Sequence, residues 1–213
     1  MKSLLVFVLF TFPLFSNNLT VELNNLQKEC KVKTVYIKLQ KEGDCFCGQG
    51  FFIHKDGYVL TAKHLIKNIT PESCSIFWID EYNHRHDLNA ELISQHPTQD
   101  VALLKVVHPL GQDFPYFEFD SSFLVPGTWV FLSYFDADHI NYFLRGGKIL
   151  HLSSKEINMC IRTFPGDSGS PYALLNGKVI GIHYGSNYIT NICIPFSLFN
   201  SWLFSPDSNF SYN

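Results

Sequence analysis

Hydrophobic residues fall in short runs along this chain, many of them alternating with polar residues, and turn-forming residues separate the runs. Alternation with a period of two is typical of a half-buried β-strand, whereas the longer spacing of an amphipathic helix is scarce here. The pattern predicts strands over residues 32–39, 48–53, 58–61, 75–79, 88–94, 101–106, 128–134, 143–152, 157–162, 170–175, 178–184 and 189–194.

Turn residues join some of these strands into hairpins. Asp56-Gly57 closes a hairpin between the second and third strands, and Asn176-Gly177 closes a later one, because both dipeptides suit the tight turns of antiparallel pairs. A short helical turn is expected at residues 62–66. So many short strands with regular turn signals predict an all-β sandwich or a pair of barrels.

The N-terminus differs from the rest of the chain. Lys2 precedes an apolar run at residues 4–15 that ends at Ser16. A basic residue, a short apolar run and a small residue in this order predict a secretory signal peptide over residues 1–17. An uncleaved anchor or a buried N-terminal helix is the alternative, although the run is short for a membrane span. We therefore expect an exported chain, secreted or periplasmic, whose mature part, residues 18–213, has no membrane span.

Composition narrows the class of protein further. The chain has 213 residues, of which 46% are hydrophobic and 16% charged, and its formal net charge is −3. That length and hydrophobic content suit one folded domain or two closely joined subdomains. A mildly acidic chain without basic clusters lacks the electrostatic footprint of a nucleic-acid-binding protein, so we expect no nucleic-acid partner.

Six cysteines leave two interpretations open. Export permits disulfides, but six cysteines allow 15 pairings, and Cys45 and Cys47 are too close for an easy mutual bond. A zinc-binding secreted domain is the rival interpretation, but the Cys-x-Cys spacing lacks the second ligand pair of structural zinc sites. We therefore expect no metal. The cysteines are Cys30, Cys45, Cys47, Cys74, Cys160 and Cys193.

Three segments carry reactive side chains in a suggestive order. "GYVLTAKHL" places His64 just after a predicted strand, "HPTQDVALLKV" places Asp100 just before one, and "PGDSGSP" places Ser168 in a tight turn. A serine hydroxyl becomes a nucleophile when a histidine takes its proton, and a buried aspartate orients that histidine. Each residue alone is commonly a core histidine, a turn cap or a loop serine. Together they predict a catalytic triad.

A triad also needs donors for the negative charge that forms on the substrate. The backbone N–H groups of Gly166 and Ser168 are the candidates for this oxyanion hole, because a glycine can turn its N–H toward a substrate without a side-chain clash. An α/β-hydrolase is excluded, since its nucleophile lies in G-x-S-x-G and its histidine comes last. Here Ser170 replaces the second glycine, and His64 comes first.

These segments resemble those of a known family. "GQGFFIHKDGYVLTAKHLI", "DVALLKV", "GDSGSP" and "GKVIGIHYG" resemble, in order, the histidine, aspartate, serine and cleft-strand segments of bacterial trypsin-like serine proteases, in particular the HtrA type. The resemblance implies the chymotrypsin fold: all-β, with two six-stranded antiparallel β-barrels, the active site between them and a short C-terminal helix. It assigns residues 30–115 to one barrel, 125–195 to the other and 196–204 to the helix. Too few residues follow Ser168 for a PDZ module, so none is expected.

The resemblance also locates a specificity pocket beside the nucleophile loop. Its expected residues include no acid, which disfavours cleavage after Lys or Arg. They are Arg162, Thr163, Phe164, His183, Tyr184, Gly185 and Ser186. The chain is similar here to bacterial glutamyl endopeptidases, in which a threonine and a histidine at the positions of Thr163 and His183 bind an acidic side chain. Some members also use the mature N-terminal amine, a role that this N-terminus does not visibly match, and Arg162 is the alternative source of positive charge.

Two further expectations rest on the resemblance alone. The strands that carry Cys160 and Cys193 should be neighbours, which suggests a disulfide between these cysteines. In the trypsin family the acid beside the serine, here Asp167, pairs with an amino terminus released by cleavage. The sequence marks no activation site and leaves the partner of Asp167 open.

The sequence therefore predicts an exported serine endopeptidase that acts on proteins or peptides without a cofactor. His64 would act as base and acid, Asp100 would orient it, and Ser168 would form the acyl-enzyme, with a preference for acidic residues at the P1 position. A protease-fold binding protein with little or no catalysis is the alternative, and an intact triad argues against it.

Overall fold

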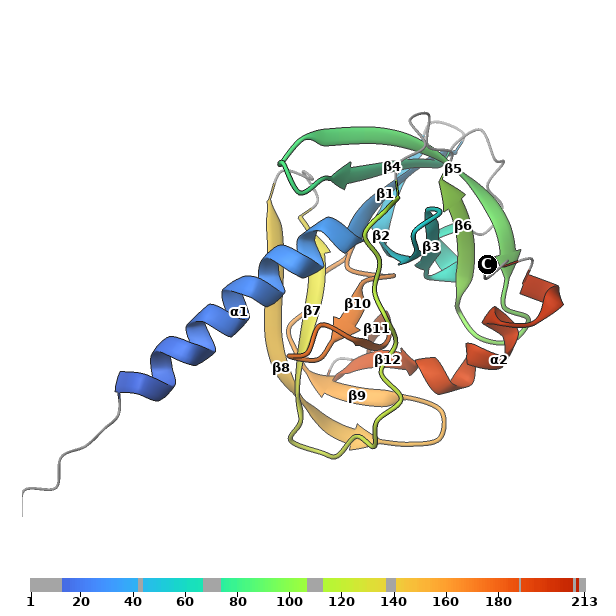
Figure 1. Cartoon of the computed structure of the whole chain (residues 1–213). Helices are drawn as coiled ribbons and strands as arrows, with labels where there is room; N and C mark the ends of the chain where they lie inside the picture. Colours follow the sequence, from blue (N-terminus) through green and yellow to red (C-terminus); the bar gives the residue numbers. More distant parts are fainter. Residues whose placement is uncertain are drawn as a thin grey trace, which may run out of the picture.

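The computed structural model describes residues 13–41, 44–66, 74–106, 113–136, 141–187, 189–208 and 210. Its strands form two closed antiparallel barrels of six strands each, which pack side by side (Figure 1). Barrels of this kind confirm the expected all-β, chymotrypsin-like architecture. Closure leaves no unpaired strand edge in either barrel.

The first barrel has the strand order β1-β2-β3-β6-β5-β4. Its strands are β1 (Thr34–Lys41), β2 (Asp44–His54), β3 (Tyr58–Thr61), β4 (Cys74–Ile79), β5 (Arg85–Gln95) and β6 (Ala102–Val106). Alternate residues of β1 show why this sequence forms a barrel wall, because Val35, Ile37 and Leu39 all point into a closed interior and are fully buried.

The second barrel has the strand order β10-β11-β12-β9-β8-β7. Its strands are β7 (Trp129–Phe135), β8 (Tyr142–Leu152), β9 (Ile157–Cys160), β10 (Pro171–Ala173), β11 (Val179–Ser186) and β12 (Asn191–Pro195). Short helices follow: η3 (Phe196–Leu198), α2 (Asn200–Leu203) and η4 (Pro206–Ser208). The expected C-terminal helix is thus present, divided into short turns.

The hairpin between β2 and β3 closes as its sequence predicts. The Gly57 N–H donates to the carbonyl of His54 over 3.0 Å, and Gly57 has φ +85°. A Cβ there would lie 2.8 Å from the ring of Phe114, so both the backbone angle and the packing call for glycine.

A long N-terminal helix, α1 (Pro13–Lys33), replaces the start of the strand expected at residue 32. Figure 1 shows its first turns leading away from the barrels and its last turns meeting them. Leu26 and Cys30 are buried in the hydrophobic cluster that both barrels share. Residues 1–12 lie outside the described part, and α1 runs through the cleavage point expected near Ser16, so the signal peptide stays a prediction.

None of the helices in the described part of the chain is both long and apolar enough to cross a membrane.

The expected bond between Cys160 and Cys193 is not formed. Their strands are neighbours, since β9 pairs with β12, but Cys193 lies opposite Ile157 in that pairing. Cys193 is completely buried, whereas Cys160 is exposed, and both are free thiols. Two side chains on opposite sides of a barrel wall cannot meet the short Cβ–Cβ distance of a disulfide.

The packing of α1 gives a test of its place in the fold. Leu26 is 3% exposed and belongs to the shared cluster, whereas Leu19 on the same helix is 50% exposed. We expect Leu26→Ala to lower the free energy of unfolding by about 2–4 kcal/mol, because it leaves a cavity between packed elements.

Leu19→Ala is the matched control for this substitution. It should change the free energy of unfolding by less than about 0.5 kcal/mol, as surface substitutions usually do. Urea unfolding followed by tryptophan fluorescence measures both variants. Equal effects of the two substitutions would mean that α1 does not pack on the barrels.

Candidate active site

His64 lies on a 3₁₀ turn, η1 (Lys63–Ile66), directly after β3. The turn is anchored to the loop that carries Asp100, whose backbone carbonyl accepts the N–H of Lys63 over 3.2 Å. One carboxylate oxygen of Asp100 accepts the backbone N–H of His64 over 2.7 Å, and the other lies 2.5 Å from the ring Nδ1 of His64. This double contact fixes the ring orientation and leaves Nε2 as the nitrogen that can accept a proton.

The loop before β6 holds Asp100 in place through a residue that sequence reasoning missed. The ring Nδ1 of His96 accepts the backbone N–H groups of Thr98 and Gln99, over 3.2 and 2.8 Å. Burial lowers the pKa of His96, and the nearby charge of Lys63 lowers it further. A neutral ring is what this role requires, because a protonated Nδ1 could not accept.

Ser168 lies in the second of two consecutive turns between β9 and β10. The N–H of Asp167 donates to the carbonyl of Phe164 over 3.1 Å, and the N–H of Ser170 donates to that of Asp167 over 3.1 Å. Pro165 and Gly166 are the central residues of the first turn, and Gly166 has φ +99°. A proline followed by a glycine with positive φ is typical of a type II turn.

Both barrels hold the Ser168 loop. The backbone N–H of Gln49 on β2 donates to the carbonyl of Ser168 over 2.8 Å, and the N–H of Gly169 donates to the carbonyl of His183 on β11 over 2.9 Å. A Cβ at Gly169 would lie only 2.0 Å from the Gln49 carbonyl, so glycine is required for this approach. The loop therefore lies at the junction of the two barrels.

Gly48 shows that the His64 and Ser168 segments meet at this junction. A Cβ at Gly48 would lie 2.2 Å from the side chain of Leu65 on one side and 3.0 Å from the Ser168 carbonyl on the other. From the second barrel, the ring of Tyr184 approaches that of His64, with 6.2 Å between ring centres. The structure thus brings the predicted histidine, aspartate and serine segments to one edge of the interface.

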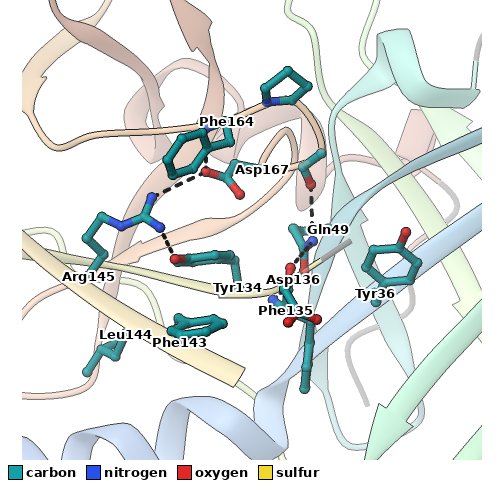
Figure 2. A pocket seen from close by; sticks show the side chains of 12 residues that line it. Tyr36, Gln49, Tyr134, Phe135, Asp136, Phe143, Leu144, Arg145, Phe164 and Asp167 are labelled. Carbon is teal, nitrogen blue, oxygen red and sulfur yellow. Dashed lines mark hydrogen bonds and ion pairs between the residues drawn. The ribbon is translucent and has the colours of Figure 1, made fainter. Parts of the chain in front are cut away.

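Asp167 finds its partner inside the chain. Its side chain is buried, accepts the N–H of Phe164 over 2.8 Å and lies 3.6 Å from Nη1 of Arg145 on β8. Arg145 also donates to the hydroxyl of Tyr134 (Figure 2) and to the carbonyl of Arg162. Burial raises the pKa of Asp167, and the Phe164 N–H and the Arg145 guanidinium only partly offset this rise. Nothing in the sequence near Arg145 signals this role.

The predicted specificity residues divide into two groups. Arg162, Thr163 and Ser186 line a cavity of about 340 Å³ beside β9, together with Asn191. The Thr163 hydroxyl donates to the side-chain oxygen of Asn191, whose amide in turn donates to the carbonyl of Ile161. Among the described residues that line it, there is one guanidinium and no carboxylate.

The other predicted specificity residues do not line this cavity. Tyr184 is 44% exposed and faces His64, and a Cβ at Gly185 would meet open space. His183 is buried, and its Nδ1 lies 3.0 Å from the hydroxyl of Tyr172. Burial lowers the pKa of His183 to about 4, a hydrogen bond with the Ile192 backbone opposes the shift, and His64 adds to it. The ring is therefore neutral near pH 7.

In the described ranges of the chain, no group of three or more histidine, cysteine or acidic side chains could hold a metal ion. The rings of His84 and His86 both lie close to a single carboxylate, that of Asp80. Oδ2 of Asp80 lies 2.9 Å from Nε2 of His86, within hydrogen-bonding distance, and 3.3 Å from Nδ1 of His84. Oδ1 of Asp80 accepts the backbone N–H groups of Tyr82 and His84.

The buried ring of His183 makes the stability of the fold depend on pH. The unfolded chain takes up a proton near pH 6.5 and the folded chain only near pH 4. Stability is therefore complete above pH 6.5 and is lost as the pH falls toward 4, because the unfolded state then binds more protons. Between pH 7 and pH 5 we expect a loss of about 2 kcal/mol from this group.

His183→Gln isolates the contribution of this ring, since glutamine does not titrate. Urea unfolding at pH 7 and at pH 5 should show a pH-dependent loss in the natural protein that exceeds that of the variant by about 2 kcal/mol. Identical pH dependence in the two proteins would contradict the assignment.

Comparison with known proteins agrees with this geometry. The family model described as "Trypsin-like peptidase domain" matches residues 48–182. A "Probable periplasmic serine endoprotease DegP-like" of Pseudomonas fulva is 35% identical over 144 residues, and its counterpart in Marinomonas sp. is 33% identical over 145 residues. These alignments cover 64% of this chain but only 28% and 29% of the relatives, so the chain spans under a third of their length.

Solved structures share the fold at low sequence identity. Deg5 matches with a TM-score of 0.76 at 19% identity, covering 88% of this chain and 96% of the other. The active form of the Rv3671c protease from M. tuberculosis matches with a TM-score of 0.72 at 21% identity, covering 86% and 85%. The paired barrels, the order of the motifs and the match of the family model together show that this chain belongs to the trypsin-like peptidase domain family.

Proposed function

We propose that this protein is a serine endopeptidase in which His64, Asp100 and Ser168 form the catalytic triad. The observation that carries the proposal is the contact of His64 Nδ1 with Asp100 Oδ2 at 2.5 Å, on a turn that adjoins the Ser168 loop. A loop histidine has no need of two bonds to one aspartate. A general base does, because its tautomer and direction must be fixed before the serine proton arrives.

The chemistry follows from the positions of these groups. Ser168 Oγ attacks the carbonyl carbon of the scissile bond, its proton passes to His64 Nε2, and the carbonyl electrons move to the oxygen. The N–H groups of Gly166 and Ser168 stabilise that oxyanion. The C–N bond then breaks, and the departing amine takes the proton from His64. Water attacks the acyl-enzyme in the same way, returns a proton to Ser168 and releases the acid.

We also propose an acidic preference at P1, with Arg162 rather than His183 as the cationic group. The support is the cavity beside β9, which Arg162 and Thr163 line and which contains no carboxylate. His183 contributes little to this preference, since its ring is buried, neutral and bonded to Tyr172. A guanidinium can bind a carboxylate with two parallel hydrogen bonds, which suits a glutamate or aspartate side chain.

Export is part of the same proposal. The curated relatives are named periplasmic serine endoproteases, and the N-terminus of this chain begins with the features of a signal peptide. The protein would act in the periplasm or outside the cell on protein or peptide substrates.

Covalent labelling tests the nucleophile. A fluorophosphonate probe should modify the natural protein, and Ser168→Ala should abolish labelling, because the phosphorus is attacked by the activated hydroxyl. Asp100→Asn should keep the fold and lower kcat by roughly 10⁴-fold, since an asparagine favours the wrong tautomer of His64. Far-UV circular dichroism serves as the folding control. A folded natural protein that takes no label would instead favour the protease-fold binding protein.

A peptide library tests the specificity. Cleavage should be most frequent after Glu or Asp, and Arg162→Gln should lower kcat/KM for these substrates about 10- to 100-fold while altering Ala substrates less than threefold, because only acidic side chains lose an ion pair. Dominant cleavage after Lys, Phe or Ala in the natural protein would overturn the acidic preference and leave the triad untouched.

A further inference from the structure

We propose that Gln49 is a positioning residue that holds the oxyanion turn in its working conformation. This inference rests on the proposed function, because it assigns a role in the same site. Gln49 lies on β2, in the first barrel, whereas the turn that it contacts belongs to the second (Figure 2). Gln49 is 1% exposed, so each of its polar atoms needs a partner within the protein.

The carboxamide of Gln49 makes three hydrogen bonds, all of them to two segments of the second barrel. Nε2 donates to the carbonyl of Gly166 over 3.1 Å and to the carbonyl of Phe135 over 3.0 Å. Oε1 accepts the backbone N–H of Phe135 over 3.0 Å. Two acceptors on one side and one donor on the other fix which end is nitrogen, because the flipped amide would face two carbonyls with its oxygen.

The backbone of Gln49 binds the nucleophile residue itself, Ser168. Its N–H donates to the carbonyl of Ser168 over 2.8 Å, and its own carbonyl accepts the hydroxyl of Thr61 over 2.6 Å. One residue therefore binds the carbonyls of both Gly166 and Ser168, on either side of Asp167. The peptide group that follows each proposed oxyanion donor is therefore tied to the same point on β2.

Such an anchor matters because an oxyanion hole depends on the relative position of its two N–H groups. The Gly166 N–H belongs to a turn in which Gly166 has φ +99°, and the Ser168 N–H follows two residues later. The Gln49 carboxamide holds the peptide group that follows Gly166, and the Gln49 N–H holds the peptide group that follows Ser168. Both proposed donors are thereby kept in place relative to β2, and preorganised donors are what stabilise an oxyanion.

The second partner of the Gln49 carboxamide, Phe135, connects the turn to a further strand. Phe135 is the last residue of β7 and lies beside the cavity of about 440 Å³ that the oxyanion turn also lines. Through Gln49 the turn is braced against β7 as well as β2. Asp167 and Arg145 brace it from β8. The turn is thus held from β2, β7 and β8, and β2 lies far from the other two strands in the sequence.

The experiment compares Gln49→Met with a matched control, Thr34→Val. Methionine keeps the length of the side chain and removes its hydrogen bonds. Thr34 makes another buried contact between the barrels, 2.5 Å from the hydroxyl of Ser133 on β7, and does not touch the nucleophile loop. For each folded variant we would measure kcat and KM on a peptide cleaved by the natural protein, and the affinity for a peptide boronic acid, which mimics the tetrahedral intermediate.

We expect Gln49→Met to lower kcat about 10- to 100-fold with KM unchanged within about twofold, and to weaken boronate binding by a similar factor. The loss should be smaller than the roughly 10²- to 10³-fold effect of deleting an oxyanion donor, because the N–H remains present but less well aimed. Thr34→Val should stay within about twofold of the natural protein in all three quantities. If Gln49→Met does not fold, Gln49→Glu, which keeps the shape but replaces the donor by an acceptor, carries the same comparison.

Two results would overturn the inference. One is a kcat for the Gln49 variant equal to that of Thr34→Val, and the other is a loss confined to KM. Failure of the proposed function looks different, since the natural protein itself would then neither cleave peptides nor bind the boronate.

Discussion

The two barrels can form a site only because the loop between β9 and β10 is bonded to a strand of the other barrel. The hydrogen bond from the Gln49 N–H to the Ser168 carbonyl is the centre of this contact, and the close approach of Gly169 to the Gln49 carbonyl shares it. His64 belongs to the first barrel and Ser168 to the second, so neither barrel alone can bring them together. The proposed catalysis depends on this junction being rigid, because it fixes the position of His64 relative to Ser168.

Sequence reasoning predicted the barrels, which the structure confirms, and proposed the three motif residues, because the signals of both are local. About ten residues of sequence are enough to recognise an alternating strand, an Asp-Gly turn or the segments around His64 and Ser168. Gln49 and Arg145 carry no such signal, because their partners lie elsewhere in the chain. The amide of Gln49, for example, bonds to a residue 86 positions away. Helix α1 was missed for a similar reason, since Leu26 and Cys30 are buried by both barrels rather than by a neighbour in sequence.

The pocket residues show where a resemblance reaches its limit. Thr163 and His183 occupy positions that suggest carboxylate binding, yet in the structure each already has a partner, Asn191 for the hydroxyl and Tyr172 for the ring. Motif matching identifies which residue stands at a position but not which way its polar atoms point. Burial decides that question here, because a neutral ring enclosed by protein is no cation for a substrate.

The pairing of Asp167 with Arg145 bears on how such an enzyme would be controlled over time. A buried carboxylate that finds its cation within the finished fold has no need of an amine set free by cleavage. Completion of the second barrel, rather than a processing event, would then mark the moment at which the site is assembled. The place and time of folding would then set where and when the proposed site is complete.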